Sequence, residues 1–174
     1  MTRRGSAQPR RASFSITRRG YLMGRIGVLS IFLACLNLAA CSSEPSFRVA
    51  DGSSLRFSDF HGEWVVLNYW AEWCAPCREE IPELNELRQQ GSERGVEIRV
   101  LGVNYDGLQG ADLDAVMQRM EIEFPVLVDD PRESFRIGRA EVLPMTVLID
   151  PQGTVQVVLS GPQTAESLLT RVES

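Results

Sequence analysis

Apolar residues in this chain gather in short segments separated by polar turns, and the spacing within each segment predicts its structure. Residues 64–70 are nearly all apolar, as expected of a central strand buried on both faces of a sheet, and Asn68 is the polar exception. Two shorter apolar segments, 47–50 and 55–57, lie on either side of a turn and predict a β-hairpin. The remaining predicted strands cover residues 96–103, 125–128, 145–149 and 154–159.

Apolar residues spaced three or four apart predict the helices. The first begins near Cys74, has Pro76 in its first turn, where no backbone donor is lost, and is expected to end at Gly91. Further helical segments are predicted at residues 108–122, 131–137 and 164–172. The alternation of strands and helices, closed by a hairpin and a helix, predicts an α/β fold with a mixed sheet in one domain, residues 47–174.

The segment before this domain has the pattern of an export signal. Residues 1–40 carry seven arginines and no acidic residue, and they end in a 15-residue, largely apolar stretch, 26–40. That length suits a signal peptide better than a membrane span, and the following Cys41 completes a sequence that resembles a bacterial lipobox. We therefore expect a signal peptide over 1–40, lipid on Cys41 and a linker over 41–46. The alternative is an uncleaved anchor helix, which leaves the domain on the same side of the membrane.

Two further features of this leader and of the charge distribution bear on export and partners. Arg18-Arg19 resembles a twin-arginine export signal. Beyond residue 40 the chain has 11 arginines against 23 acidic residues, a net charge of −12. Such an acidic domain is not expected to bind nucleic acid, whose phosphates need a basic surface.

Cys74 and Cys77 carry the candidate chemistry, because they are the only cysteines within the predicted domain, residues 47–174. As a structural disulfide they would close a very short loop and add little stability. A structural zinc site needs four ligands, and this part of the chain adds only His61, which we expect at the surface rather than as a catalytic base. A redox pair is favoured, since a thiol at the start of a helix ionises readily.

The segment around these cysteines resembles the thioredoxin fold, and more narrowly the membrane-tethered TlpA/ResA-like thiol–disulfide oxidoreductases. The matching motifs are Asn68-Tyr69-Trp70-Ala71 before the cysteines, Cys77-Arg78-Glu79-Glu80-Ile81-Pro82 after them, and Leu143-Pro144-Met145-Thr146 before the last hairpin. The N-terminal hairpin and the extra helix within 108–122 also match. The resemblance implies a three-layer α/β/α sandwich around a mixed sheet.

The resemblance also implies a role for each matching residue. Cys74 is expected to be the exposed nucleophile and Cys77 the buried resolving thiol. Pro144 is expected to follow a cis peptide bond and to present the Leu143 backbone to a substrate strand. Glu80 is expected to pass a proton to Cys77, and the alternative for Glu80 is a solvated charge like those of its acidic neighbours. Substrate contacts are expected from Trp73, Ala75, Pro76, Leu143 and Met145.

The sequence departs from its relatives at two points. Asn68 stands where thioredoxin has a buried aspartate, so proton transfer is expected to rely on Glu80 or water. Leu143 precedes Pro144 without the glycine that relatives dedicated to cytochrome c maturation often carry nearby, which leaves the client protein open. The neutral Ala75-Pro76 pair offers no cation to stabilise the thiolate, and a reducing potential near that of thioredoxin is expected.

Together these inferences predict an extracytoplasmic, lipid-anchored, monomeric protein-disulfide reductase. Its expected partners are disulfides of client proteins and a membrane thiol carrier that donates electrons, with no cofactor or metal besides the dithiol. Two alternatives remain open: an oxidant of secreted thiols, and a Cu(I)-binding module using Cys74, Cys77 and Met145.

Overall fold

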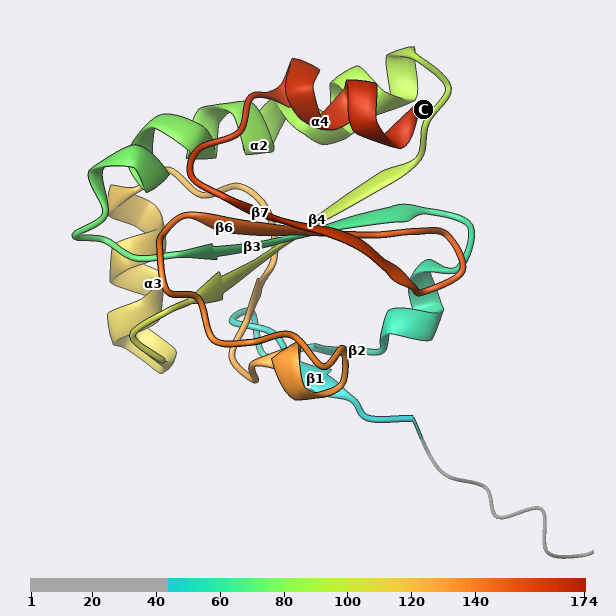
Figure 1. The fold of residues 1–174 in the computed structure, drawn as a ribbon. Helices are drawn as coiled ribbons and strands as arrows, with labels where there is room; N and C mark the ends of the chain where they lie inside the picture. The colour runs from blue at the N-terminus through green and yellow to red at the C-terminus, as the bar shows by residue number, and fades with distance from the viewer. Residues whose placement is uncertain (1–43) are drawn as a thin grey trace, which may run out of the picture. The chain divides into compact units, whose positions relative to one another are not determined.

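A five-stranded mixed sheet forms the centre of the computed structural model, which describes residues 44–174 (Figure 1). The predictions of a signal peptide and of lipid on Cys41 lie outside these residues. The strands follow the order β5-β4-β3-β6-β7, with β3, β4 and β5 parallel and with β6 and β7 antiparallel to their neighbours. Their bounds are β3 Trp64–Trp70, β4 Ile98–Asn104, β5 Val126–Leu127, β6 Met145–Ile149 and β7 Val155–Ser160.

Helices cover one face of this sheet. α2 (Ala75–Glu93) and α4 (Ala165–Val172) lie side by side above the strands in Figure 1. α3 (Gly110–Arg119) connects β4 to β5, and its buried Leu113 and Val116 join the same apolar cluster as the inner faces of α2 and α4. Trp70 is the largest fully buried side chain and belongs to this cluster.

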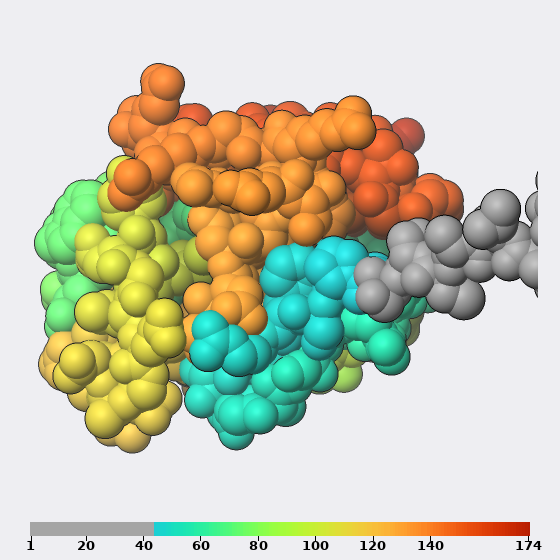
Figure 2. Space-filling model, turned by 90° about the horizontal axis from the view of Figure 1, so that it is seen from below, coloured from blue at the N-terminus to red at the C-terminus, as the bar shows by residue number. Residues whose placement is uncertain are grey.

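The other face is covered by shorter elements. The hairpin of β1 (Phe47–Arg48) and β2 (Ser54–Leu55) and the 3-10 turns η1 (Phe57–Phe60) and η2 (Pro131–Glu133) build this layer. Figure 2 looks onto it and shows the cyan hairpin region beside the orange segment that follows β5. Three phenylalanines, Phe47, Phe57 and Phe135, pack edge to face there. An exposed ion pair between Arg48 and Asp129 also joins the hairpin to the segment that follows β5.

The predicted fold class is confirmed: the mixed sheet, the N-terminal hairpin and the inserted helix are all present. The predicted type I turn between β6 and β7 is also present, since the Gly153 amide donates to the Asp150 carbonyl at 2.8 Å. Among residues 44–174, no helix is both long enough and apolar enough to cross a membrane.

The prediction that Gly91 ends the first helix is wrong. α2 continues to Glu93, and Gly95, with φ +77°, is the residue that reverses the chain. The amide of Val96 donates to the Gly91 carbonyl and that of Gly95 to the Ser92 carbonyl, which is the Schellman arrangement of helix ends. Gly91 is instead needed for close packing, because a Cβ there would lie 2.9 Å from Ile98 Cδ1 and from the Val96 carbonyl oxygen.

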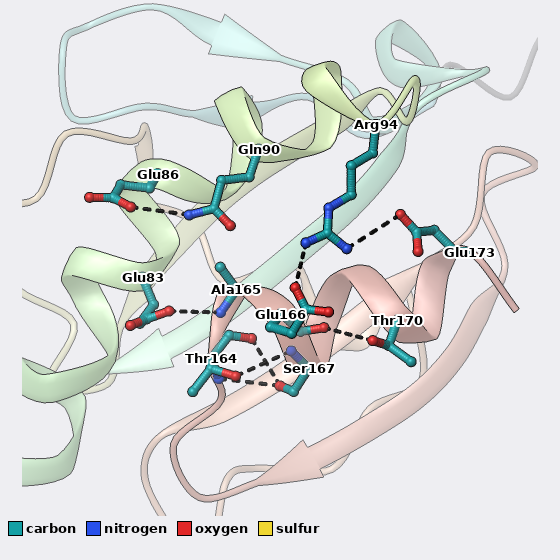
Figure 3. A network of polar contacts seen from close by, with 10 residues as sticks. All are labelled: Glu83, Glu86, Gln90, Arg94, Thr164, Ala165, Glu166, Ser167, Thr170 and Glu173. Atoms are coloured by element: carbon teal, nitrogen blue, oxygen red, sulfur yellow. Dashed lines mark hydrogen bonds and ion pairs between the residues drawn. The ribbon is translucent and has the colours of Figure 1, made fainter.

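Polar contacts join α2 and α4 on the outer surface (Figure 3). The Thr164 side chain caps the N-terminus of α4 by accepting from the Ser167 amide. Glu83, which was expected to be a solvated charge like Glu79, accepts from the Ala165 amide at 3.0 Å and is half-buried, so that expectation is wrong for Glu83. Arg94 near the end of α2 pairs with Glu166 and Glu173.

Candidate active site

The dithiol lies at the junction of β3 and α2, as predicted. Cys74 is the N-cap of α2, and its Sγ accepts from the Cys77 amide at 3.2 Å. Both cysteines are joined in a disulfide. The unpaired amides of the first turn and the positive end of the helix dipole favour a thiolate at this position over a thiol.

Cys74 is less exposed than predicted. Its side chain is 4% exposed and that of Cys77 is fully buried. In the disulfide form, the Cys74 sulfur is held against the first turn by its bond to Cys77 and by the Cys77 amide, which explains the low exposure. Trp73 has the accessible surface instead, at 65% exposed. Its indole N–H donates to Asp106, and its ring meets Tyr105 edge to face.

The loop before β6 brings Pro144 to the same end of the sheet. The Leu143–Pro144 peptide bond is cis, as predicted. Met145 pairs with Tyr69 across β3 and β6, so Pro144 stands beside the end of β3 that leads to Cys74. Within residues 44–174 the Leu143 backbone makes no hydrogen bond to other backbone groups, which leaves it free to pair with an incoming strand.

Glu80 is a buried carboxyl at the centre of a polar cluster. Its side chain is 1% exposed, which excludes the alternative of a solvated charge. It accepts from Asn68 Nδ2 at 2.8 Å, from Thr146 Oγ1 at 3.2 Å and from the Gln163 amide at 3.0 Å. Burial raises the pKa of Glu80 above its ordinary value, although these three hydrogen bonds act in the opposite direction. Glu80 also lies three residues, about one helical turn, after Cys77 in α2.

Two members of this cluster were not singled out from the sequence. Thr146 lies directly opposite Asn68 in the β3–β6 ladder and accepts from Asn68 Nδ2 at 3.0 Å. A hydroxyl within the otherwise apolar β6 was a usable signal, like the one that Asn68 gave in β3. Gln163 contributes a backbone amide, which leaves no trace in the sequence.

The remaining predicted contact residues separate into two groups. Ala75 and Pro76 form the first turn of α2, between the two cysteines. Met145, in contrast, is 5% exposed and packs in the apolar cluster on the sheet face opposite the one that holds Cys74 and Cys77. The structure therefore does not bring Met145 together with the two cysteines, whether for substrate contact or for Cu(I).

His61 lies at the far end of the sheet. It precedes β3, whereas Cys74 follows that strand, and seven extended residues span about 20 Å. Its side chain is exposed, as expected of a surface residue. In the part of the chain that the structure describes, no three His, Cys, Asp or Glu residues gather as metal ligands would.

The site combines a dithiol at a helix start with a cis-proline beside it and a buried carboxyl one turn along. This combination defines a thiol–disulfide oxidoreductase of the thioredoxin fold. Comparison with known proteins agrees with this class. The model of the AhpC/TSA family matches residues 42–158. ResA thiol–disulfide oxidoreductase from Geobacillus kaustophilus is 33% identical over 139 residues, which cover 79% of this chain and 78% of the relative. ResA from Bacillus cereus ATCC 10987 is 35% identical over 126 residues, 71% of each chain.

Solved structures resemble the chain in the same way. The exposed lipoprotein thioredoxin Etrx1 of Streptococcus pneumoniae aligns with a TM-score of 0.62 at 25% identity, over 75% of this chain and 98% of its own. A DsbF homologue from Corynebacterium diphtheriae aligns with a TM-score of 0.64 at 26% identity, over 75% and 83% of the two chains. The chain belongs to the AhpC/TSA family and, within it, to the ResA-like thiol–disulfide oxidoreductases.

Proposed function

We propose that this protein is a membrane-tethered reductase that uses Cys74 and Cys77 to reduce disulfides of client proteins outside the cytoplasm. The observation that carries the proposal is the placement of the dithiol beside Pro144 and the unpaired Leu143 backbone. A client strand that pairs with this backbone would hold its disulfide against the start of α2.

The reaction follows from this arrangement. The Cys74 thiolate attacks one sulfur of the client disulfide, whose S–S bond breaks, and the other client sulfur leaves as a thiolate and takes up a proton. Cys77 then loses its proton, attacks the Cys74 sulfur and releases the second client sulfur as a thiol. The client gains two electrons and two protons, which the Cys74–Cys77 pair loses.

Glu80 is the group proposed to receive the Cys77 proton. Its raised pKa lets it exchange protons closer to neutral pH than an exposed carboxyl does. In the reverse direction, when the disulfide is reduced again, the same carboxyl returns a proton to the leaving Cys77 sulfur. Asn68, Thr146 and the Gln163 amide hold the carboxyl in place in both directions.

Location and electron supply are inferred from the sequence and from relatives. Lipid on Cys41 would tether the domain to the membrane, and the solved relative from Streptococcus pneumoniae is named an exposed lipoprotein. A reductase in an oxidising compartment needs electrons from the cytoplasm, which a membrane thiol carrier would deliver. Clients are polypeptides with accessible disulfides: apocytochrome c, a copper-site protein or oxidised thiols in general.

Trapping the client tests the proposal. Cys77→Ser keeps the nucleophile but removes the resolving thiol, so it is expected to accumulate mixed disulfides with client polypeptides through Cys74. Cys74→Ser is the matched control and is expected to accumulate none. Identification of the trapped polypeptides would name the client class. Absence of any adduct from Cys77→Ser, together with tight Cu(I) binding to the wild type, would favour a metal-binding module instead.

A further inference from the structure

A pocket opens on the sheet face opposite α2, outside the catalytic cluster. Its volume is about 250 Å³, and it lies at the carboxyl ends of β3 and β4. Its lining includes Tyr69, Tyr105, Asp130, Arg132, Arg139 and Ala140. A pocket with a few converging polar groups is the usual form of a small binding site.

The charges in this pocket differ from those of the whole domain. Two guanidinium groups, of Arg132 and Arg139, face one carboxylate, of Asp130, whereas residues 44–174 carry 11 arginines against 23 acidic residues. The Asp130 carboxylate already has partners. Arg132 Nε lies 3.5 Å from it as an ion pair, and the Tyr69 hydroxyl donates a hydrogen bond to it at 2.9 Å. The local excess is therefore one positive charge, on Arg139.

Arg139 is held so that its donors stay available. Its guanidinium carbon lies 4.7 Å from the centre of the Tyr105 ring, and no carboxylate of residues 44–174 pairs with it. A cation–π contact uses no N–H donor, so the guanidinium N–H groups stay free to bind a carboxylate in a two-pronged arrangement. The contact with the ring also favours one orientation of this exposed side chain before any ligand arrives.

Contacts link this pocket to the reactive cysteines from two sides. The Tyr105 ring that carries Arg139 also meets the ring of Trp73, the residue before Cys74. Arg139 and Ala140 belong to the segment that leads into Leu143 and the cis-proline. A polypeptide that is joined to Cys74 and paired with Leu143 would reach this pocket if it continues along the segment from Leu143 back to Arg139.

We propose that the Tyr105–Arg139 pocket binds an acidic side chain of the client polypeptide, near the client cysteine that reacts with Cys74. This inference rests on the proposed function for the identity of the ligand. The pocket would select acidic clients that the negative charge of the rest of the domain disfavours, and so would contribute specificity rather than a uniform attraction.

Kinetics with paired peptides test the proposal. Pairs of disulfide-bonded peptides are compared as substrates of the wild-type protein. The two peptides of a pair differ only in having Glu or Gln at one position. Successive pairs place that residue at each position near the reacting cysteine. At one or more positions the Glu peptide is expected to have a kcat/KM about tenfold above that of the Gln peptide, as one charge-assisted hydrogen bond allows. Arg139→Gln is expected to remove this preference.

Arg136→Gln is the matched control. Arg136 carries the same charge on the same segment, is exposed, and lies outside the lining of the pocket. It is expected to retain the Glu preference. The proposal is overturned if the wild type shows no preference for Glu at any position, if Arg139→Gln retains the preference, or if Arg136→Gln loses as much of it as Arg139→Gln does.

A binding measurement separates this proposal from the proposed function. Succinate is titrated into the oxidised protein while the ring resonances of Tyr69 and Tyr105 are followed by NMR. Saturable shifts in the wild type that are lost in Arg139→Gln support the pocket, even if the protein reduces neither peptide. Absence of such shifts, together with equal rates for both peptides, overturns the pocket and leaves the reductase function standing.

Discussion

The side-chain amide of Asn68 donates a hydrogen bond of 2.8 Å to the Glu80 carboxylate, across the contact between β3 and α2. Both side chains are buried, and the Asn68 Oδ1 atom has no partner within residues 44–174. Asn68 therefore contacts Glu80, a carboxyl that comes from α2, at the position where the resemblance to thioredoxin implies a buried aspartate.

The first prediction concerns the pH dependence of folding stability. Because the pKa of Glu80 is raised on folding, the folded protein binds more protons than the unfolded chain at pH values between the two pKa values. Stability from this group is therefore present at acid pH, below the unfolded value near 4.5, and is lost as the pH rises through the folded value. Urea unfolding of the oxidised protein across this window is expected to show a decline that Glu80→Gln lacks. Parallel curves for the two proteins would contradict it.

The same substitution is expected to slow catalysis. Glu80→Gln removes the proposed proton acceptor for Cys77, so release of the client from the mixed disulfide is expected to fall by on the order of a hundredfold near neutral pH. Stopped-flow measurement of each step checks this, because formation of the mixed disulfide by Cys74 is expected to change less than its resolution. Equal slowing of both steps would point to a purely structural role.

Thr146→Val tests the cluster without touching the carboxyl. The hydrogen bond from the Thr146 hydroxyl lowers the pKa of Glu80, so its loss is expected to raise that pKa further. The pH profile of the resolution step is then expected to shift to higher pH. A stability loss of about 1 kcal/mol is expected from the missing hydrogen bond. Thr154→Val, at an exposed position before β7, is the control and is expected to leave the profile unchanged. An unshifted profile in Thr146→Val would count against the cluster.

Most of the fold followed from hydrophobic spacing, and the exceptions have physical causes. The central strands β3, β4 and β6 and the helix α4 were predictable because each buries a regular set of apolar side chains. The sequence predicted too early an end for α2, because a glycine often marks the end of a helix. Gly91 lies inside α2 instead, where packing against Ile98 requires a glycine. Within the site, Cys74, Cys77 and Pro144 were found from motifs. The hydrogen-bond partners of Glu80 were not predicted, since they come from β3, β6 and the Gln163 backbone and depend on the tertiary fold.

Gly102 provides a packing prediction. Gly102 lies in β4, directly opposite Asn68 of β3, and a Cβ at this position would lie 2.9 Å from both Trp70 Nε1 and Phe124 Cε2. Gly102→Ala is expected to destabilise the protein by about 1–3 kcal/mol, as overpacking in a core does. Gly138→Ala, where the added methyl group meets open space, is the control for the loss of a glycine. Urea unfolding of both variants checks this, and equal stabilities would contradict the packing argument.

The polar contacts of α4 are expected to contribute unequally to stability. Thr164→Ala removes the cap of α4 and is expected to lower stability by about 1 kcal/mol. Arg94→Gln removes exposed ion pairs to Glu166 and Glu173, which salt screens, and is expected to have a smaller effect that vanishes at high ionic strength. Thermal unfolding at two salt concentrations distinguishes the two effects. A larger loss from Arg94→Gln would reverse this ranking.

The direction of electron flow is the central claim, and the equilibrium of the Cys74–Cys77 pair with glutathione tests it most directly. Ala75 and Pro76 place no charge between the cysteines, so we expect a reduction potential near about −270 mV, the value of thioredoxin. Glu80→Gln and wild type measured side by side would show how much the buried carboxyl contributes. A wild-type potential above about −180 mV, the level of a disulfide isomerase, would contradict the reductase and favour an oxidant.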